Sequence, residues 1–326
     1  MVSASDIFSL SGQKQFEKLA LKIFRYQYQE NAVYHEFCNH LKVDVSTVKS
    51  LSHIPFLPIN FFKSNEVVAG DVFIQEIFTS SGTTGMSHSR HFVSDVEIYK
   101  ESYSRAFSQF YGDIKDYVVL ALLPSYLERN GSSLIYMIND LIIQSSNRHS
   151  GFYLDNLDEL SIKLAELDSS GQNVILIGVT YAMLDLIERN QFKLKNTIIM
   201  ETGGMKGKRR EMIREELHEQ LRKGFGVTTI HSEYGMTELL SQAYSLGNGI
   251  FECPNWMQIF IRDTEDPLTY VHEGKTGGIN VIDLANINSC SFIATQDLGK
   301  KCSNNSFVVL GRFDNSDIRG CNLLVV

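Results

Sequence analysis

Short apolar runs alternate with amphipathic stretches along this chain, and that alternation limits the folds it can adopt. Residues 118–123, 174–178 and 197–200 are such runs, and each is followed by a turn and a helical pattern of apolar residues. Short apolar runs bounded by turns are typical of strands buried on both faces. Strands that alternate with helices predict an α/β fold.

The clearest helix is predicted after Gly207. Ile213, Leu217 and Leu221 recur every four residues among Arg, Glu and Gln, which places them on one helical face. Gly224 supplies the predicted end, because glycine readily adopts the left-handed conformation that terminates helices. The charged residues between the apolar ones are predicted to face solvent.

The helical pattern fades after about residue 250. Residues 278–284, 291–294 and 307–310 are predicted to be shorter strands. The chain has 326 residues, enough for two subdomains, because single cores tend to stop growing near ~250–300 residues. We expect a mainly α/β core in residues 1–250, and a β-rich subdomain with a short C-terminal tail in residues 251–326.

Charge and cysteine content exclude several classes of protein. The net charge of −8 provides no basic field to neutralise phosphates, so nucleic acid is not an expected partner. The five cysteines are odd in number and include no C-x-x-C pair, which argues against a disulfide framework or a zinc site. The N-terminus lacks a basic segment followed by an apolar run, and no apolar stretch is long enough to span a membrane. We expect a cytoplasmic protein.

A loop rich in glycine and hydroxyl side chains is the first candidate for a binding site. Glycines let backbone N–H groups approach phosphate oxygens, and Ser and Thr hydroxyls add further donors. It is not the P-loop of the NTPases, because Met86 and Ser87 follow Gly85 where that motif requires Lys and then Ser or Thr. By itself the loop also fits a solvent-exposed turn. Its residues are Ser80, Ser81, Gly82, Thr83, Thr84 and Gly85.

A second motif, residues 232–238, has the sequence Ser-Glu-Tyr-Gly-Met-Thr-Glu. Thr237 and Glu238 place a hydroxyl beside a carboxylate, a pair suited to an α-phosphate and its Mg²⁺. Taken alone, the pair has a second interpretation, a helix N-cap followed by a first-turn acid. The two motifs together indicate an ATP-dependent adenylating enzyme.

Four motifs resemble, in the same order, the core motifs of the acyl-CoA synthetase and firefly luciferase superfamily: residues 80–85, 233–238, 295–298 and 311–320. Within it, the chain is most similar to the acyl-protein synthetases of bacterial bioluminescence, the fatty-acid-activating component of a fatty acid reductase complex. Residues 54–63, 232–239 and 317–321 carry this closer likeness. The resemblance implies an adenylate-forming large-domain fold, and thus a single adenylation domain over residues 1–326.

The resemblance also implies roles in binding ATP and Mg²⁺. Thr237 would contact the α-phosphate and Glu238 would hold Mg²⁺, both as catalytic residues. Tyr234 would stack on adenine, Asp297 would accept hydrogen bonds from the ribose hydroxyls, and Arg312 would be a second ribose or phosphate contact. The other implied nucleotide-binding residues are Ser80, Ser81, Gly82, Thr83, Thr84, Gly85, Gly203, Gly204, Glu233 and Gly235.

Several of these residues also have a structural interpretation. Tyr234 fits a half-buried core tyrosine, Asp297 a turn residue and Arg312 a surface ion pair. The histidines near the motifs, His88, His91 and His231, are not spaced as metal ligands and are predicted to be structural, although His231 is also placed to line the acyl pocket.

Larger members of the superfamily continue into a mobile C-terminal domain, whose lysine bridges the carboxylate and the α-phosphate. This sequence ends at Val326, so we expect that domain to be lacking and assign no such lysine. Cys321 stands where the domain would begin, and its position resembles that of the cysteine acylated in the bioluminescence synthetases. Its structural interpretation is a buried, inert thiol.

These features lead to one prediction and two alternatives. We predict that the chain activates a fatty acid as acyl-AMP and passes the acyl group to a protein thiol, with Cys321 as its own catalytic thiol and a reductase or carrier protein as the partner. A long apolar chain is expected to lie in a hydrophobic tunnel. The alternatives are an acyl- or aryl-CoA ligase related to phenylacetate-CoA ligase, and a nucleotide-binding scaffold subunit with weakened catalysis.

Overall fold

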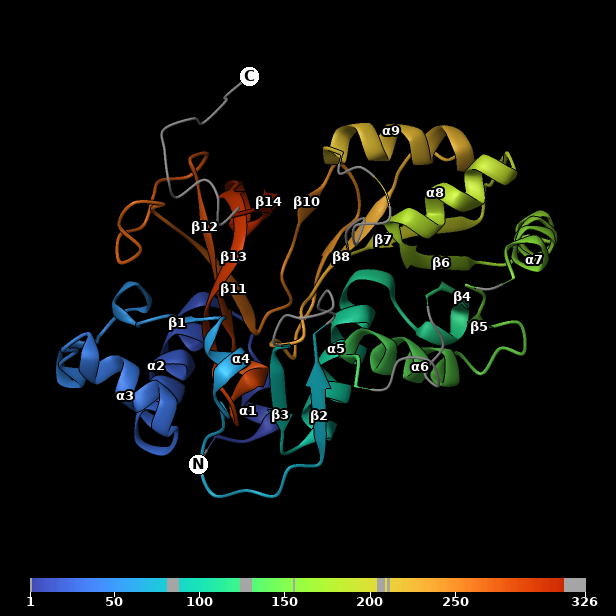
Figure 1. Cartoon of the computed structure of the whole chain (residues 1–326). Helices are drawn as coiled ribbons and strands as arrows, with labels where there is room; N and C mark the ends of the chain where they lie inside the picture. Colours follow the sequence, from blue (N-terminus) through green and yellow to red (C-terminus); the bar gives the residue numbers. More distant parts are fainter. Residues whose placement is uncertain are drawn as a thin grey trace.

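Two large sheets lie side by side, and a small hairpin lies between them (Figure 1). The computed structural model describes residues 2–80, 88–123, 131–154, 156–203, 209 and 212–313. The first large sheet has the strand order β5-β4-β6-β7-β8-β9, in which only β9 runs antiparallel to its neighbour. Its strands are β4 (Val118–Leu122), β5 (Gly151–Phe152), β6 (Val174–Val179), β7 (Thr197–Thr202), β8 (His231–Tyr234) and β9 (Ala243–Ser245).

Helices cover both faces of this sheet. In Figure 1, α8 and α9 lie above it and α5 and α6 below it. Every residue of β4 and β6 is buried, as expected for parallel strands between two helical layers. The predicted α/β fold and its strands are therefore confirmed. The helices are α5 (Val96–Tyr111), α6 (Ser133–Ser145), α7 (Leu157–Ser169), α8 (Thr180–Arg189) and α9 (Arg214–Phe225).

Helix α9 corrects the predicted end at Gly224. The helix continues to Phe225, and Gly226 ends it with a φ of 70°, the left-handed conformation that glycine allows. Gly224 serves packing instead, because a Cβ there would lie 2.5 Å from the Cβ of Ile187 on α8. Ile213 also departs from the prediction, since it precedes the helix and is exposed.

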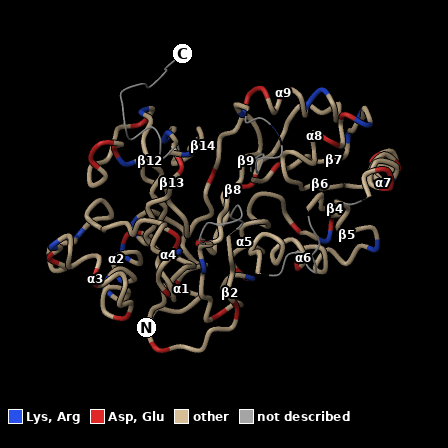
Figure 2. The backbone as a smooth tube through the Cα atoms, viewed as in Figure 1, with Lys and Arg blue, Asp and Glu red and all other residues tan. Residues whose placement is uncertain are grey.

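The charged face predicted for α9 is confirmed for most of its residues, although Arg214 and Arg222 are only partly exposed. Glu215, Glu216, Glu219 and Lys223 are exposed, and Figure 2 shows acidic and basic residues interspersed along this helix. Arg214 is only partly exposed and pairs with a buried carboxylate. Helical periodicity alone does not separate such a residue from its exposed neighbours.

The second large sheet is β-rich and antiparallel, with the order β10-β14-β13-β12-β11, and β1 (Leu57–Pro58) pairs parallel to β13. The strands predicted after residue 250 are confirmed, but β13 is longer than the predicted 291–294. Polar residues 295–297 hide its continuation, although burial alternates along the strand as it does in a half-buried sheet. The strands are β10 (Ile250–Phe251), β11 (Met257–Arg262), β12 (Thr276–Asp283), β13 (Phe292–Lys301) and β14 (Phe307–Arg312).

The N-terminal helices pack against this β-rich part. The Gln27 amide donates to the carbonyls of Asn286 and Ile287 at 3.0 and 2.8 Å, and the Asn31 amide donates to Ser289 at 2.9 Å. These contacts fix the 3₁₀ turn η4 (Leu284–Asn286), which matters for the site. The elements here are α1 (Ala4–Phe8), α2 (Gln13–Glu30), α3 (Ala32–His40), η1 (Val45–Thr47), η2 (Leu51–His53) and α4 (Phe61–Ser64).

The hairpin between the two sheets consists of β2 (Glu76–Thr79) and β3 (Arg90–Val93). Its strands flank residues 81–87, the greater part of the predicted phosphate loop. The remaining short elements are η3 (Ile114–Asp116) and η5 (Ser303–Asn305). Over the described ranges, no helix combines the length and apolar character needed to cross a membrane.

Candidate active site

The turn after β8 carries Thr237 and Glu238. Strand β8 ends at Tyr234, and residues 235–240 are not helical. The interpretation of this pair as a helix N-cap is therefore wrong, because no helix begins here. Gly235 is required by close packing, since a Cβ would lie 2.5 Å from Oε1 of Glu233 and 3.2 Å from Cγ of Gln242.

The hairpin brings the two sequence motifs together. The Ser89 N–H donates to Oγ of Ser80 at 2.9 Å, and the Ser80 N–H donates to the carbonyl of Ser89 at 3.1 Å. Nδ1 of His91, on β3, lies 2.8 Å from the carbonyl oxygen of Thr237. Both ends of the segment 81–87 thus lie close to the turn, although the two motifs are far apart in the sequence.

Glu238 is a buried carboxylate, 5% exposed, at this junction. Burial raises its pKa, while the hydrogen bond from Ser89 and the charges of Arg312 and Lys63 act in the opposite direction. Among the ion pairs of the described residues, none involves Glu238. A bound cation would relieve the cost of its buried charge, so this residue fits the predicted Mg²⁺ ligand.

The described residues contain no cluster of three or more His, Cys, Asp or Glu that could hold a metal. The single carboxylate of Glu238 fits Mg²⁺, because Mg²⁺ in nucleotide sites is held by one or two carboxylates together with phosphate oxygens and water.

Tyr234, Asp297 and Arg312 meet where β8 packs against the second sheet. The Tyr234 hydroxyl donates to Oδ2 of Asp297 at 2.8 Å, and Arg312 Nε donates to Oδ1 at 3.3 Å. Asp297 on β13 lies directly opposite Arg312 on β14. The ring of Tyr234 packs edge to face against Phe251 and Phe307. Three residues predicted at the nucleotide therefore form one polar group.

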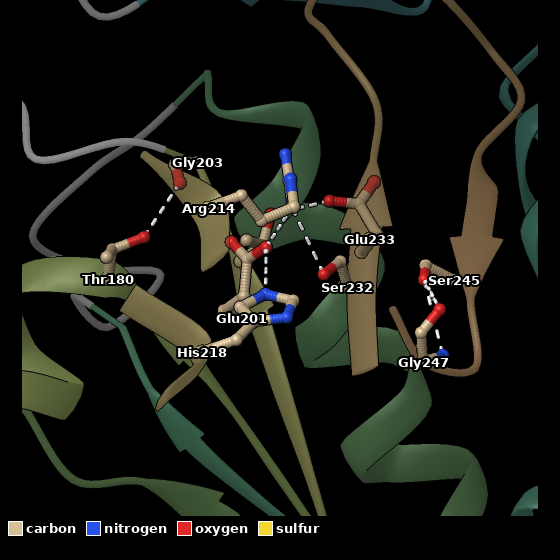
Figure 3. Close-up of polar contacts among 10 residues, drawn as sticks. Thr180, Glu201, Gly203, Arg214, His218, Ser232, Glu233, Ser245 and Gly247 are labelled. Carbon is tan, nitrogen blue, oxygen red and sulfur yellow. Dashed lines mark hydrogen bonds and ion pairs between the residues drawn. The ribbon is translucent and has the colours of Figure 1, made fainter. Parts of the chain in front are cut away.

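Gly203 and Glu233 lie at the ends of neighbouring strands β7 and β8 (Figure 3). The carbonyl of Gly203 accepts a hydrogen bond from Oγ1 of Thr180 at 2.9 Å. The carboxyl of Glu233 accepts one from the Thr202 hydroxyl, and burial raises its pKa to about 7. Both residues stand at the carboxyl edge of the parallel strands, where open α/β sheets place their ligands.

A buried charged cluster beside this edge was missed by the sequence analysis (Figure 3). Arg214 donates to the carboxylate of Glu201 and to Oγ of Ser232, and Nε2 of His218 lies 3.4 Å from the same carboxylate. Burial alone would raise the pKa of Glu201, but the hydrogen bond from His218 and the charge of Arg214 hold it below its usual value. The sequence did contain an indication of this cluster. Arg214 and His218 are four residues apart, which places them on the same side of α9 as the buried Leu217.

His231 lies at the opposite end of β8 from the turn. Its Nδ1 is 3.2 Å from the Tyr111 hydroxyl, and burial lowers its pKa. It lines a cavity of about 450 Å³ together with Lys195, Thr197 and the segment 226–229. The predicted place of His231 in an acyl pocket stays a prediction.

The cysteines in the described part of the chain, Cys38, Cys253, Cys290 and Cys302, are free thiols, and burial raises the pKa of Cys38 to about 12.

Several predicted site residues lie outside the described part of the chain. These predicted site residues are Ser81, Gly82, Thr83, Thr84, Gly85, Gly204 and Cys321.

Comparison with known proteins decides the family. The profile of the family described as "Acyl-protein synthetase, LuxE" matches residues 1–326, the whole chain. The chain belongs to the acyl-protein synthetase family. It is 26% identical over 320 residues to the long-chain-fatty-acid–luciferin-component ligase of Vibrio harveyi, covering 90% of this chain and 81% of that protein. The ligase of the same name from Photorhabdus luminescens is 33% identical over 75 residues, 23% of this chain and 64% of that protein.

Solved structures show the same fold. A 2-hydroxyisobutyryl-CoA ligase in complex with 2-HIB-AMP and CoA matches with a TM-score of 0.66 and 13% identity, over 93% of this chain and 70% of that one. ATP-bound MatB from Rhodopseudomonas palustris matches with a TM-score of 0.54 and 17% identity over 73% of this chain. The match covers 48% of MatB, so the chain spans about half the length of that relative. The predicted adenylate-forming fold is confirmed.

Proposed function

We propose that this acyl-protein synthetase uses ATP to activate a fatty acid as acyl-AMP and then transfers the acyl group to a protein cysteine. A carboxylate oxygen attacks the α-phosphorus, the bond to the bridging oxygen breaks, and pyrophosphate leaves. A thiolate then attacks the acyl carbonyl carbon, and AMP leaves with the electrons of the broken C–O bond. Both steps are catalysed by stabilising negative charge as it develops.

One observation carries this proposal. Strand β3, which follows the predicted phosphate loop, contacts the turn that holds Thr237 and Glu238, because Nδ1 of His91 lies 2.8 Å from the carbonyl oxygen of Thr237. A loop of N–H and hydroxyl donors and a buried carboxylate would then share one triphosphate. Mg²⁺ held by Glu238 would neutralise phosphate charge, and Thr237 would contact the α-phosphate.

The nucleoside would lie against the group formed by Tyr234, Asp297 and Arg312. The Asp297 carboxylate already accepts from Tyr234, and its second oxygen has only the long contact with Arg312. The Arg312 side chain is 81% exposed, so it can move aside for a ribose hydroxyl at little cost. Gly203, Gly204, Glu233 and Gly235 would border the adenine.

The names of the relatives support a proposal for the acyl chain, and the sequence position of Cys321 supports one for its acceptor. The curated relatives are named as long-chain fatty acid ligases, so we propose a long apolar chain in a tunnel, with each buried methylene adding about 0.8 kcal/mol of binding free energy. We propose Cys321 as the thiol that receives the acyl group, and a reductase or carrier protein as the next acceptor. An ATP-consuming enzyme of this kind belongs in the cytoplasm.

Carboxylate-dependent ATP–pyrophosphate exchange across a panel of acids tests the first step. We expect exchange to rise with chain length until the tunnel ends. A flat profile, or a preference for phenylacetate, would favour the CoA ligase related to phenylacetate-CoA ligase, and no exchange with any acid would favour the scaffold subunit.

Labelled fatty acid tests the second step. After incubation with ATP and denaturation, wild-type protein should hold label that hydroxylamine releases, and Cys321→Ser should not. Equal label in both proteins would place the thioester elsewhere.

A further inference from the structure

The side chain of His91 lies between the hairpin and the turn after β8. It is fully buried on β3 and packs edge to face against Phe62. Its Nδ1 is 2.8 Å from the carbonyl oxygen of Thr237, and its Nε2 is 3.0 Å from Oδ1 of Asn286 on η4. It therefore contacts the predicted catalytic turn and the β-rich part of the molecule at once.

Asn286 completes the arrangement from the other side. It is also fully buried, and its Nδ2 donates to the carbonyl of Glu238 at 2.8 Å. The carbonyls of two successive residues, Thr237 and Glu238, are thus each held by a buried side chain. The two side chains, those of His91 and Asn286, belong to elements that are far from the turn in the sequence.

Leu240 and Ser241, which follow the turn, are also held by the β-rich part of the molecule. Asp283, at the end of β12, accepts hydrogen bonds from the N–H of Leu240 at 2.8 Å and from the hydroxyl of Ser241. The backbone of the turn therefore cannot rotate without breaking buried hydrogen bonds, and a buried polar group left without a partner is costly.

The protonation of His91 limits its ring to one donated hydrogen bond. Burial lowers its pKa to about 4, so the ring is neutral near pH 7 and carries one proton. The Thr237 carbonyl and Oδ1 of Asn286 can both only accept, and the shorter contact, 2.8 Å from Nδ1 to Thr237 against 3.0 Å from Nε2 to Asn286, favours donation to Thr237. Both ring nitrogens face oxygen atoms, and the neutral ring donates to only one of them.

We propose that His91 is a positioning residue for adenylation. By holding the Thr237 carbonyl, while Asn286 holds that of Glu238, it fixes the orientation in which the Thr237 hydroxyl and the Glu238 carboxylate face the nucleotide. This rests on the proposed function of the turn. Support of this kind matters because reacting groups lose much of their effect when they are displaced by even 1 Å.

Three variants of His91 test the proposal by ATP–pyrophosphate exchange with tetradecanoate at varied MgATP. In His91→Asn the side-chain nitrogen is bonded to Cγ, like Nδ1 of histidine, so it can still donate to Thr237. His91→Leu has nearly the same shape as the asparagine variant but no donor. His91→Gln places its nitrogen one atom further out, towards Asn286.

We expect kcat/KM for MgATP to fall about tenfold in His91→Leu and His91→Gln, the usual effect of losing a buried hydrogen bond, and to stay within about threefold of wild type in His91→Asn. His35→Leu is the matched control, because Nδ1 of His35 also lies 2.8 Å from a carbonyl, that of Tyr28, away from the turn. Its kcat/KM should not change.

Equal kcat/KM in the asparagine and leucine variants, or an equal loss in His35→Leu, would overturn the proposal. If His91→Leu does not fold, the comparison of asparagine with glutamine decides. Glu238→Gln in the same assay distinguishes the proposed function of the turn from the positioning role of His91. Wild-type exchange in that variant would refute the role of the turn, whereas impaired exchange there with normal exchange in His91→Leu would refute only the positioning role.

Discussion

Replacing Arg214 with methionine should destabilise the protein in a pH-dependent way. Methionine keeps much of the length of the arginine side chain but removes the charge that faces the buried carboxylate of Glu201. Breaking one partner of a buried ion pair typically costs 3–5 kcal/mol. Arg214 is 27% exposed and His218 remains beside Glu201, so we expect about 2–3 kcal/mol at pH 7.5.

The pH dependence follows from Glu201. In the wild type its pKa is held below the usual value, so its contribution to stability is present above about pH 4.5 and is lost only as the pH falls through the lowered pKa. Without Arg214, burial should raise the pKa above 4.5. The folded variant then takes up a proton that the unfolded chain does not, and it gains up to about 1.4 kcal/mol per pH unit as the pH falls towards 4.5.

Thermal unfolding of both proteins at pH 7.5 and pH 5 measures this effect. At pH 7.5 the Tm of Arg214→Met should lie about 4–10 °C below that of the wild type, and the gap should narrow by half or more at pH 5. Arg222→Met on the same helix is the control, because no ion pair among the described residues involves Arg222, and the Tm of this variant should change little. A gap that is equal at both pH values, or no larger than that of the control, would refute the reasoning.

Two further predictions concern Glu233 and Gly224. The pKa of Glu233 is raised to about 7, so its neutral form stabilises the fold below pH 4.5 and that stability is lost as the pH rises to 7. Glu233→Gln should therefore gain up to about 3 kcal/mol in free energy of unfolding over the wild type between pH 4.5 and pH 7. Denaturant titrations that show a pH-independent difference would contradict this. Gly224→Ala should cost about 1–3 kcal/mol because its methyl meets Ile187 at 2.5 Å. Ile187→Ala should then lower the free energy of unfolding less in the Gly224→Ala variant than in the wild type. If the losses of the two single variants simply add in the double variant, the predicted clash is refuted.

The sequence predicted the elements whose pattern is local. Strands β4 and β6 are buried throughout, so a continuous apolar run marks them. Strand β13 extends past its apolar start because residues 295–297 keep pairing while carrying polar side chains, and hydropathy does not reveal pairing. Gly224 and Gly226 are both plausible helix ends in the sequence, and only the contact with Ile187 separates their roles.

The site was predictable in its motifs but not in its supports. Short motifs predicted Thr237, Glu238, Asp297 and Arg312 as candidate site residues, together with Tyr234. His91 was predicted only to be structural and Asn286 was not considered, because each contacts a turn that is far away in the sequence. Interactions between distant segments leave no periodic pattern, so a single sequence does not show them.

Glu238 and the predicted phosphate loop, residues 80–85, are proposed to bind MgATP for adenylation. Exchange of pyrophosphate into ATP, measured with tetradecanoate and folded Glu238→Gln, tests it most directly, with Glu66→Gln as an exposed control of the same chemistry. We predict that Glu238→Gln loses on the order of 2–4 kcal/mol of transition-state stabilisation, about 30- to 1000-fold in rate, while the control keeps the wild-type rate. Wild-type exchange in Glu238→Gln would contradict the account.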